Sequence, residues 1–202
     1  MLKYLVICVI GLPANLYAQD TTYYANGEIK SLGSHSGGKK IGNWVYYYSN
    51  GELLATETFK AGELHGEVKY FNEDGVLIGV EQWSEGLLTD SASYYYNNGQ
   101  VEKVGVYKEG LYEGVWKFYH TNGQLKRAMN YENGSPHGEW RFFNEHGILI
   151  QEGRYVEGKE SGEWKFYTDE GKLEYVGSYN DGERVGDWFY INEKGRKKKV
   201  DY

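Results

Sequence analysis

The sequence predicts an all-β protein: an elongated single-layer antiparallel sheet built from tandem 24-residue β-hairpins. Glycines recur every 24 residues in three fixed phases along the 202-residue chain. Each period also holds two short runs of alternating side chains, the pattern of strands with two distinct faces. No window of helical length avoids a turn glycine, and glycine is unfavourable inside a helix. A fixed period of this length indicates an array in which each unit packs only on its neighbours.

The glycine phases divide residues 19–195 into units that start near residues 18, 42, 66, 90, 114, 138, 162 and 186. The most regular phase marks a turn in every unit and comprises Gly27, Gly51, Gly75, Gly99, Gly123, Gly147, Gly171 and Gly195. A second turn phase runs without exception from Gly38 to Gly182. Asn-Gly and Asp-Gly pairs at the first phase, such as Asn50-Gly51, are strong hairpin signals. The two phases predict 15 turns and up to 16 strands.

Alternation assigns the side chains of each unit to two faces. One position recurs as Trp44, Val68, Ala92, Trp116, Trp140, Trp164 and Trp188, and a ring always follows two residues later. The second run of each unit adds a recurrent Leu and a ring such as Tyr179, and we expect Leu173 and Tyr179 to share the tryptophan face. An aromatic ring beside a strand glycine covers its bare backbone. We therefore expect a continuous ladder of rings on this face.

Two units lack the tryptophan and carry Val68 and Ala92 instead. On the strand between them, Trp83 replaces the usual tyrosine. Packed layers tolerate substitutions that conserve the total volume. We expect the Trp83 ring to fill the space beside Val68 and Ala92.

Residues 1–18 have the layout of a secretory signal peptide, with Lys3 before the apolar run Leu5–Leu12 and Ala18 at the expected cleavage point. The run is shorter than the roughly 20 residues of a membrane span. We therefore expect an exported protein, either periplasmic, on the cell surface or secreted. If the segment is instead an apolar first strand, the protein is cytoplasmic. The only cysteine, Cys8, lies within this segment, so a mature chain has no disulfide.

Residues 196–202 form a basic C-terminal tail that begins with Arg196-Lys197-Lys198-Lys199. Lysines at a sheet edge discourage pairing with further strands, and this use is favoured over contact with an acidic partner. The whole chain has a formal charge of −7. This balance argues against nucleic acid or an anionic membrane as the main partner.

The repeat itself has a recognisable motif. Residues 162–182 read Gly-x-Trp-x-Phe-Tyr-x-x-x-Gly-x-Leu and then Gly-x-Tyr-x-x-Gly. This pattern, which covers residues 19–195, resembles the bacterial MORN-repeat variant, a family that includes YwqK-type antitoxins of toxin–antitoxin systems. The resemblance implies an elongated single-layer sheet of hairpins and a protein-binding or scaffolding role.

No catalytic, metal or cofactor site is predicted. The carboxylates lie mostly in or beside turns, where no shared cleft perturbs their pKa values. His65 and His137 occupy the same repeat phase three units apart, too far to share a metal ion. Zinc sites need clustered ligands, and no such spacing occurs. We therefore expect a non-enzymatic protein.

A second row of rings is the candidate binding surface. Its members are Tyr47, Phe71, Tyr95, Tyr119, Phe143 and Tyr167, which alternation places opposite the tryptophans. Exposed aromatic stripes commonly mark interaction sites, although a purely structural role is equally compatible with the pattern. The leading hypothesis is an exported scaffold that binds a protein partner through this aromatic-lined face. The alternatives are an antitoxin or immunity-type inhibitor of one toxin and, more weakly, glycan or cell-surface binding.

Overall fold

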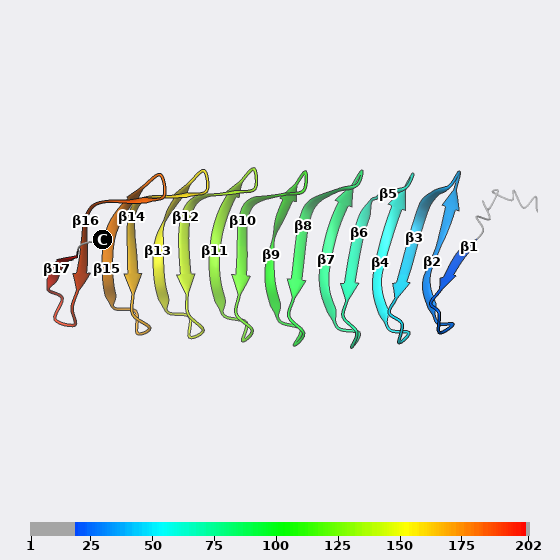
Figure 1. Cartoon of the computed structure of the whole chain (residues 1–202), viewed down its shortest axis with the longest axis horizontal. Helices are drawn as coiled ribbons and strands as arrows, with labels where there is room; N and C mark the ends of the chain where they lie inside the picture. The colour runs from blue at the N-terminus through cyan, green and yellow to red at the C-terminus, as the bar shows by residue number, and fades with distance from the viewer. Residues whose placement is uncertain (1–18, 201–202) are drawn as a thin grey trace, which may run out of the picture.

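The computed structural model describes residues 19–200, which form one open antiparallel sheet of 17 strands. Each strand pairs with the next one in the chain, except that β5 and β6 both pair with β4, so the sheet grows in a single direction. The strands lie side by side in one layer, with turns along both long edges (Figure 1). The predicted fold class is therefore confirmed. The predicted signal peptide, residues 1–18, lies outside the described residues.

Most strands are eight or nine residues long, which suits hairpins with one turn at each end. Their bounds are β1 (Gln19–Tyr23), β2 (Ile29–Ser36), β3 (Lys39–Tyr47), β4 (Leu53–Lys60), β5 (Glu63–Leu64), β6 (Gly66–Phe71), β7 (Leu77–Ser84), β8 (Leu87–Tyr95) and β9 (Val101–Lys108). They continue as β10 (Leu111–Tyr119), β11 (Leu125–Glu132), β12 (Ser135–Phe143), β13 (Leu149–Val156), β14 (Lys159–Tyr167), β15 (Leu173–Asn180), β16 (Glu183–Ile191) and β17 (Lys197–Val200).

The count of 17 agrees with the expected 16 strands once one interruption is considered. β5 and β6 both pair with β4 and together occupy one strand position. The break falls at His65, where Gly66 has φ of 95°. The His65 N–H still donates to the Thr58 carbonyl at 2.8 Å, so the hairpin remains closed.

The glycines of the first turn phase end a short loop that carries a β-bulge. In the β14–β15 hairpin, the Thr168 N–H donates to the Lys172 carbonyl and the Gly171 N–H donates to the Thr168 carbonyl, both at 2.8 Å. Gly171 has φ of 80°, a conformation that glycine adopts at no steric cost. The bulge shifts the register, so Leu173 pairs with Tyr167.

This pairing corrects one expectation from the sequence. Directly opposed residues of an antiparallel pair lie on the same face. Leu173 therefore shares the face of Tyr167, and the prediction that it shares the face of Tyr179 is wrong. The extra residue of the bulge, Glu174, breaks the simple alternation on which that prediction relied.

The second turn phase forms two-residue hairpins at the other edge. In the β13–β14 turn, Glu157 has φ of 49° and Gly158 has φ of 82°, the pattern of a type I′ turn. The Gly158 N–H donates to the Pro136 carbonyl of the preceding hairpin at 2.8 Å. The same bond recurs between neighbouring turns along this edge. Each turn is thus held by the unit before it.

The two ends of the sheet are β1 and β17. The predicted basic tail is itself an edge strand, because Lys197, Lys198 and Lys199 pair with β16. Lys199 forms an ion pair with Asp187 on that strand. None of the residues from 19 to 200 belongs to a helix long and apolar enough to cross a membrane.

Candidate binding face

The tryptophan face is the side of the sheet that carries Trp44, Val68, Ala92, Trp116, Trp140, Trp164 and Trp188. All seven side chains are buried, although no second layer covers the described sheet. Trp116 is 0% exposed and Trp164 is 1% exposed. Rings from neighbouring strands supply the cover: Tyr155 and Tyr179 approach Trp164 edge-on, with centroid distances of 5.2 and 5.8 Å. Ring contacts join residues between 35 and 59 and between 107 and 190, but none is formed within residues 60–106, so the expected ladder is interrupted there.

Strand glycines make room for these indoles. Gly177 lies directly opposite Trp164 on β14, and Trp188 of β16 covers it from the other side. A Cβ at Gly177 would lie 2.1 Å from the Trp188 ring, far inside contact distance. The same arrangement joins Gly33 to Trp44, Gly105 to Trp116 and Gly153 to Trp164. These four indoles therefore pack on bare backbone, whereas Trp140 lies opposite Met129.

A glutamate replaces this glycine on the strand that precedes each position without tryptophan. Glu57 and Glu81 occupy the positions that correspond to Gly105 and Gly153. Glu81 pairs directly with Val68, whereas Trp83 pairs with Gly66 and Leu88. The Glu81 side chain thus lies beside Val68, and the Trp83 indole donates to it at 3.0 Å. The Trp83 ring is half-buried on the same face.

Glu81 is the centre of a polar cluster inside the aromatic face. Its side chain is 8% exposed and accepts hydrogen bonds from Tyr70 Oη at 3.0 Å, Trp83 Nε1 at 3.0 Å and Tyr94 Oη at 2.6 Å. Burial and the hydrogen bond to Glu81 raise the pKa of the Tyr94 phenol. Three donors compensate the buried carboxylate, so it needs no external ligand.

Sequence reasoning missed this cluster, although one signal was available. Tyr46, Tyr70 and Tyr94 carry hydroxyls in the units around the two glutamates, whereas the next three units have Phe118, Phe142 and Phe166 at the same position. The combination of glutamate for glycine, a small residue for tryptophan and tyrosine for phenylalanine indicates a buried, hydrogen-bonded carboxylate.

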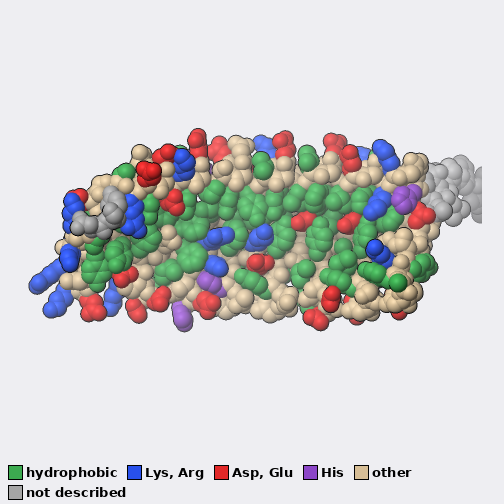
Figure 2. Space-filling view, in the orientation of Figure 1, with side chains coloured by type: hydrophobic (Ala, Val, Ile, Leu, Met, Phe, Trp, Pro, Cys, Tyr) green, Lys and Arg blue, Asp and Glu red, His purple; other side chains and the backbone are tan. Residues whose placement is uncertain are grey.

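A row of residues, here called the central row, crosses the whole tryptophan face beside the indoles. In register order it comprises Ser31, Tyr46, Ala55, Tyr70, Gly79, Tyr94, Lys103, Phe118, Arg127, Phe142, Gln151, Phe166, Tyr175, Tyr190 and Lys198. A band of hydrophobic side chains runs along one face of the molecule, with a few basic and acidic groups inside it (Figure 2).

Cations lie over the rings of this face. Lys40 Nζ is 4.6 Å from the Trp44 ring centroid, and Arg184 Cζ is 4.3 Å from that of Trp188. Such cation–π contacts are favourable, and the aliphatic stems add apolar cover. The cations therefore help to shield the indoles from water.

A groove of this face lies near its C-terminal end. Its volume is about 700 Å³, and its aromatic walls include Phe142, Phe166, Tyr175 and Trp188. Tyr175 is 37% exposed, and its ring lies 5.4 Å from that of Tyr190. The groove thus leaves aromatic surface open to solvent.

The six rings predicted as the second row lie on the opposite face, next to the bulges. Each is half-buried and opposes an aliphatic residue of its own hairpin, as Tyr119 opposes Leu125. Tyr167 Oη donates to Glu152 Oε1 at 2.6 Å, and burial together with this carboxylate raises the pKa of Tyr167 to about 12. No ring–ring contact joins any two of these six described residues, in contrast to the packed indoles.

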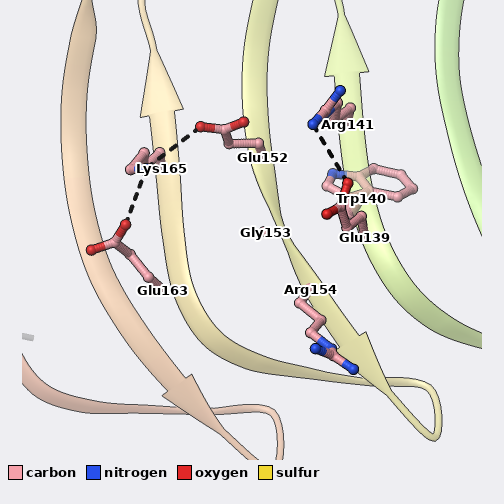
Figure 3. Close-up of a pocket in the computed structure, with 8 residues that line it drawn as sticks. All are labelled: Glu139, Trp140, Arg141, Glu152, Gly153, Arg154, Glu163 and Lys165. Carbon is pink, nitrogen blue, oxygen red and sulfur yellow. Dashed lines mark hydrogen bonds and ion pairs between the residues drawn. The ribbon is translucent and has the colours of Figure 1, made fainter.

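The rest of the opposite face combines charged and polar side chains with exposed valines such as Val106 and Val115. A shallow depression of about 280 Å³ is crossed by ion pairs, with Lys165 Nζ 3.1 Å from Glu163 and 3.7 Å from Glu152 (Figure 3). Arg141 pairs with Glu139 at 3.4 Å on the neighbouring strand. These side chains are exposed or half-exposed, so such pairs contribute little to stability. Within residues 19–200, no group of His, Cys, Asp and Glu is arranged to hold a metal ion.

The repeat is identified by comparison with known families. Residues 40–61, 64–84, 91–109, 112–133, 136–157 and 160–181 match the MORN repeat variant. The chain belongs to this family. No curated protein matches the chain.

Solved structures offer only distant similarity. The GtfA/B complex bound to UDP and GlcNAc matches 74% of this chain and 26% of its own, with 12% identity and a TM-score of 0.22. The TcdB2-TccC3-TEV structure matches 89% of this chain and 12% of its own, with 13% identity and a TM-score of 0.24. A porin-like protein from Bacteroides uniformis matches 90% of this chain and 92% of its own, with 9% identity and a TM-score of 0.21. The chain spans only a small part of the first two, and these scores carry no argument about function.

Proposed function

We propose that this MORN repeat protein is a non-enzymatic, exported scaffold that binds a protein partner through an aromatic-lined face of its sheet. Repeats of this family are often modules that bind proteins or membranes. The proposal is supported most directly by the single layer itself. One sheet cannot cover both of its faces, and half-buried rings remain along each of them.

The second row is the proposed contact surface. Strands lie about 4.8 Å apart, so equivalent rings of successive hairpins are spaced by about 10 Å. That spacing presents a regular row of rings between charged, polar and valine side chains. Aromatic side chains of this kind are typical anchors of protein interfaces.

The test is capture of a partner by the tagged chain from the source cells. A triple variant Tyr95→Ser, Tyr119→Ser and Tyr167→Ser is expected to lose a protein that the wild type retains. A matched control, Leu87→Ser with Leu111→Ser, removes exposed apolar side chains from the turn edge and should retain it. Equal capture by both variants would exclude the second row as the contact surface.

The resemblance to antitoxins supports a second candidate function, inhibition of one specific toxin. Co-expression with the product of a neighbouring gene should then suppress that product's toxicity. Fractionation separates the two candidates, because an exported scaffold appears outside the cytoplasm with its N-terminal segment removed. Binding of the wild-type chain to purified cell-surface glycans, lost when the second-row tyrosines are replaced, would instead favour the weaker, glycan-binding alternative.

A further inference from the structure

We propose that Lys103 and Arg127 form a receptor on the tryptophan face for a carboxylate side chain in an acidic, aromatic segment of the partner protein. This inference rests on the proposed protein-binding function and adds to it a second contact and a partner chemistry. It concerns the middle of the sheet, on the face opposite the second row.

The two cations occupy equivalent places on either side of one ring. In the central row, Lys103 and Arg127 each pair with Phe118, from β9 and β11. Arg127 Cζ lies 4.0 Å from the Phe118 ring centroid. Lys103 Nζ lies 4.3 Å from the Tyr94 ring centroid and donates to Tyr112 Oη at 2.9 Å. Both side chains are half-buried.

Neither cation has a counter-ion within the described chain. Among residues 19–200, no carboxylate oxygen lies within 4.0 Å of Lys103 Nζ or of the Arg127 guanidinium. Arg127 Nε is in addition buried and has no hydrogen-bond acceptor. Partly buried charges and donors without partners are unfavourable, so an external anion would be stabilised here.

The surroundings have the size and chemistry of a side-chain pocket. A cavity of about 340 Å³ lies over the two cations, with Phe118, Tyr112 and Tyr131 among its walls. Lys126 and Glu102 also line it, so the lining carries three cations and one carboxylate. A guanidinium binds a carboxylate through two parallel hydrogen bonds, and the rings offer apolar contact to a neighbouring aromatic side chain.

The charge of the whole chain favours a protein segment over an anionic membrane. The chain carries −7 overall, which opposes approach to an extended anionic surface. The cations are instead gathered in a small pocket among rings, which suits a single carboxylate. An acidic residue beside an aromatic one in a flexible partner segment satisfies both requirements.

The direct test uses the purified chain and two short peptides, acetyl-Phe-Glu-Phe-amide and its neutral counterpart acetyl-Phe-Gln-Phe-amide. Binding is followed by the fluorescence of the tryptophans and by NMR shifts of the peptide. The glutamate peptide is expected to bind at least about tenfold more tightly, since charge-assisted hydrogen bonds are the strong ones. The difference should shrink as salt is raised.

The variants Lys103→Met and Arg127→Met should abolish the preference for glutamate. Lys117→Met removes a cation from the exposed opposite face of β10, and it serves as the matched control that keeps the preference. Thermal melts verify that all three variants are folded. Equal binding of the two peptides, or binding of neither, overturns the inference.

Two further experiments test other anionic ligands for this pocket. Binding of inorganic phosphate that competes with the glutamate peptide, at similar affinity, would overturn the assignment in favour of a small anion. A membrane would be the assigned partner if the wild-type chain binds vesicles with anionic lipid, both variants lose this binding, and the wild-type chain does not bind the glutamate peptide. That outcome would overturn the inference. If partner capture requires the second row but not Lys103 or Arg127, the scaffold function stands and this inference fails.

Discussion

At the scale of single residues, the contact between Gly177 and Trp188 explains why the repeat needs a glycine inside a strand. The indole lies on the bare backbone, where even a methyl group has no room. Trp188 is 2% exposed as a result. Glycine is normally unfavourable in a strand, and here the buried indole offsets that cost.

We therefore predict that Gly177→Ala lowers the free energy of unfolding by about 1–3 kcal/mol, because overpacking displaces the Trp188 ring. Chemical denaturation followed by tryptophan fluorescence measures the change. Ser178→Ala, which alters the opposite face of the same strand, is the control and should change stability by less than about 0.5 kcal/mol. A Gly177→Ala protein as stable as the wild type would contradict this account of the indole packing.

Glu81 and Ala92 provide a second residue-scale prediction. Ala92→Trp alone would place an indole against the Glu81 side chain, and Glu81→Gly alone would leave the Tyr70 and Tyr94 hydroxyls without their acceptor. Both single variants should be destabilised. The double variant recreates the Gly–Trp arrangement of the regular units, so its loss should be smaller than the sum by about 0.5–3 kcal/mol.

A thermodynamic cycle of denaturation midpoints measures this coupling. Additive losses would show that the glutamate does not occupy the place of the indole.

At the scale of the element, the hairpin is the unit that the chain repeats, and neighbouring hairpins are joined at both edges. Tyr48 Oη donates to the Phe71 carbonyl at 2.9 Å and Tyr96 Oη donates to the Tyr119 carbonyl at 2.9 Å, each across 23 residues. On the other edge, the Gly110 N–H donates to the Leu88 carbonyl at 2.7 Å. Equivalent bonds recur in successive units, so they can form again between the units that become neighbours when one whole unit is removed.

Two deletions of 24 residues test which units are interchangeable. Removal of residues 66–89 brings Ala92 against Glu57, which reproduces the existing contact of a small residue with a glutamate. Removal of residues 90–113 brings Trp116 against Glu81, where the regular units have glycine. We expect the first variant to fold with a single cooperative transition and the second to melt at a clearly lower temperature.

Circular dichroism melts of the two variants give the comparison, and both lose the same length of chain. Equal melting temperatures would contradict the proposed match between strand glycine and indole.

At the scale of the whole molecule, residues 19–200 form a single layer without a central core, and the stability of this layer depends on its tyrosines and tryptophans. Burial and nearby carboxylates raise the pKa values of several phenols above the ordinary value of 10.0, among them Tyr155 and Tyr167, both to about 12. For Tyr155 the main cause is burial, followed by the charge of Glu160.

This shift predicts a loss of stability in alkali. Below pH 10 these phenols are protonated in both the folded and the unfolded chain, so their contribution is fully present. Between pH 10 and 12 the unfolded chain releases protons that the folded chain retains, and the free energy of unfolding falls. Denaturation at pH 8, 10 and 11 measures the fall, which should be shallower in Tyr155→Phe.

Absorbance of tyrosinate gives an independent check. Ionisation of all tyrosines near pH 10 with the sheet intact would show that these phenols are not perturbed.

Much of this architecture is predictable from local chemistry. The turn glycines, the Asn-Gly pairs and the alternation of rings each act within a few residues, and together they indicate the hairpins, the single layer and the tryptophan face. The strand number was also accessible, because one turn phase follows another without a gap. What remains open at that level is the role of the second row, Tyr47 to Tyr167, since half-buried rings serve packing and binding alike.

The sequence by itself determined the repeat, the strand order and the face on which Trp164 lies, because these follow from period and turn chemistry. Only the tertiary structure decided that Leu173 joins the face of Tyr167, that Glu81 lies opposite Val68, and that Lys103 and Arg127 flank Phe118 without a counter-ion among residues 19–200. The physical reason is the bulge in each hairpin. One extra residue resets the cross-strand register, and partners from distant parts of the chain meet only once that register is known.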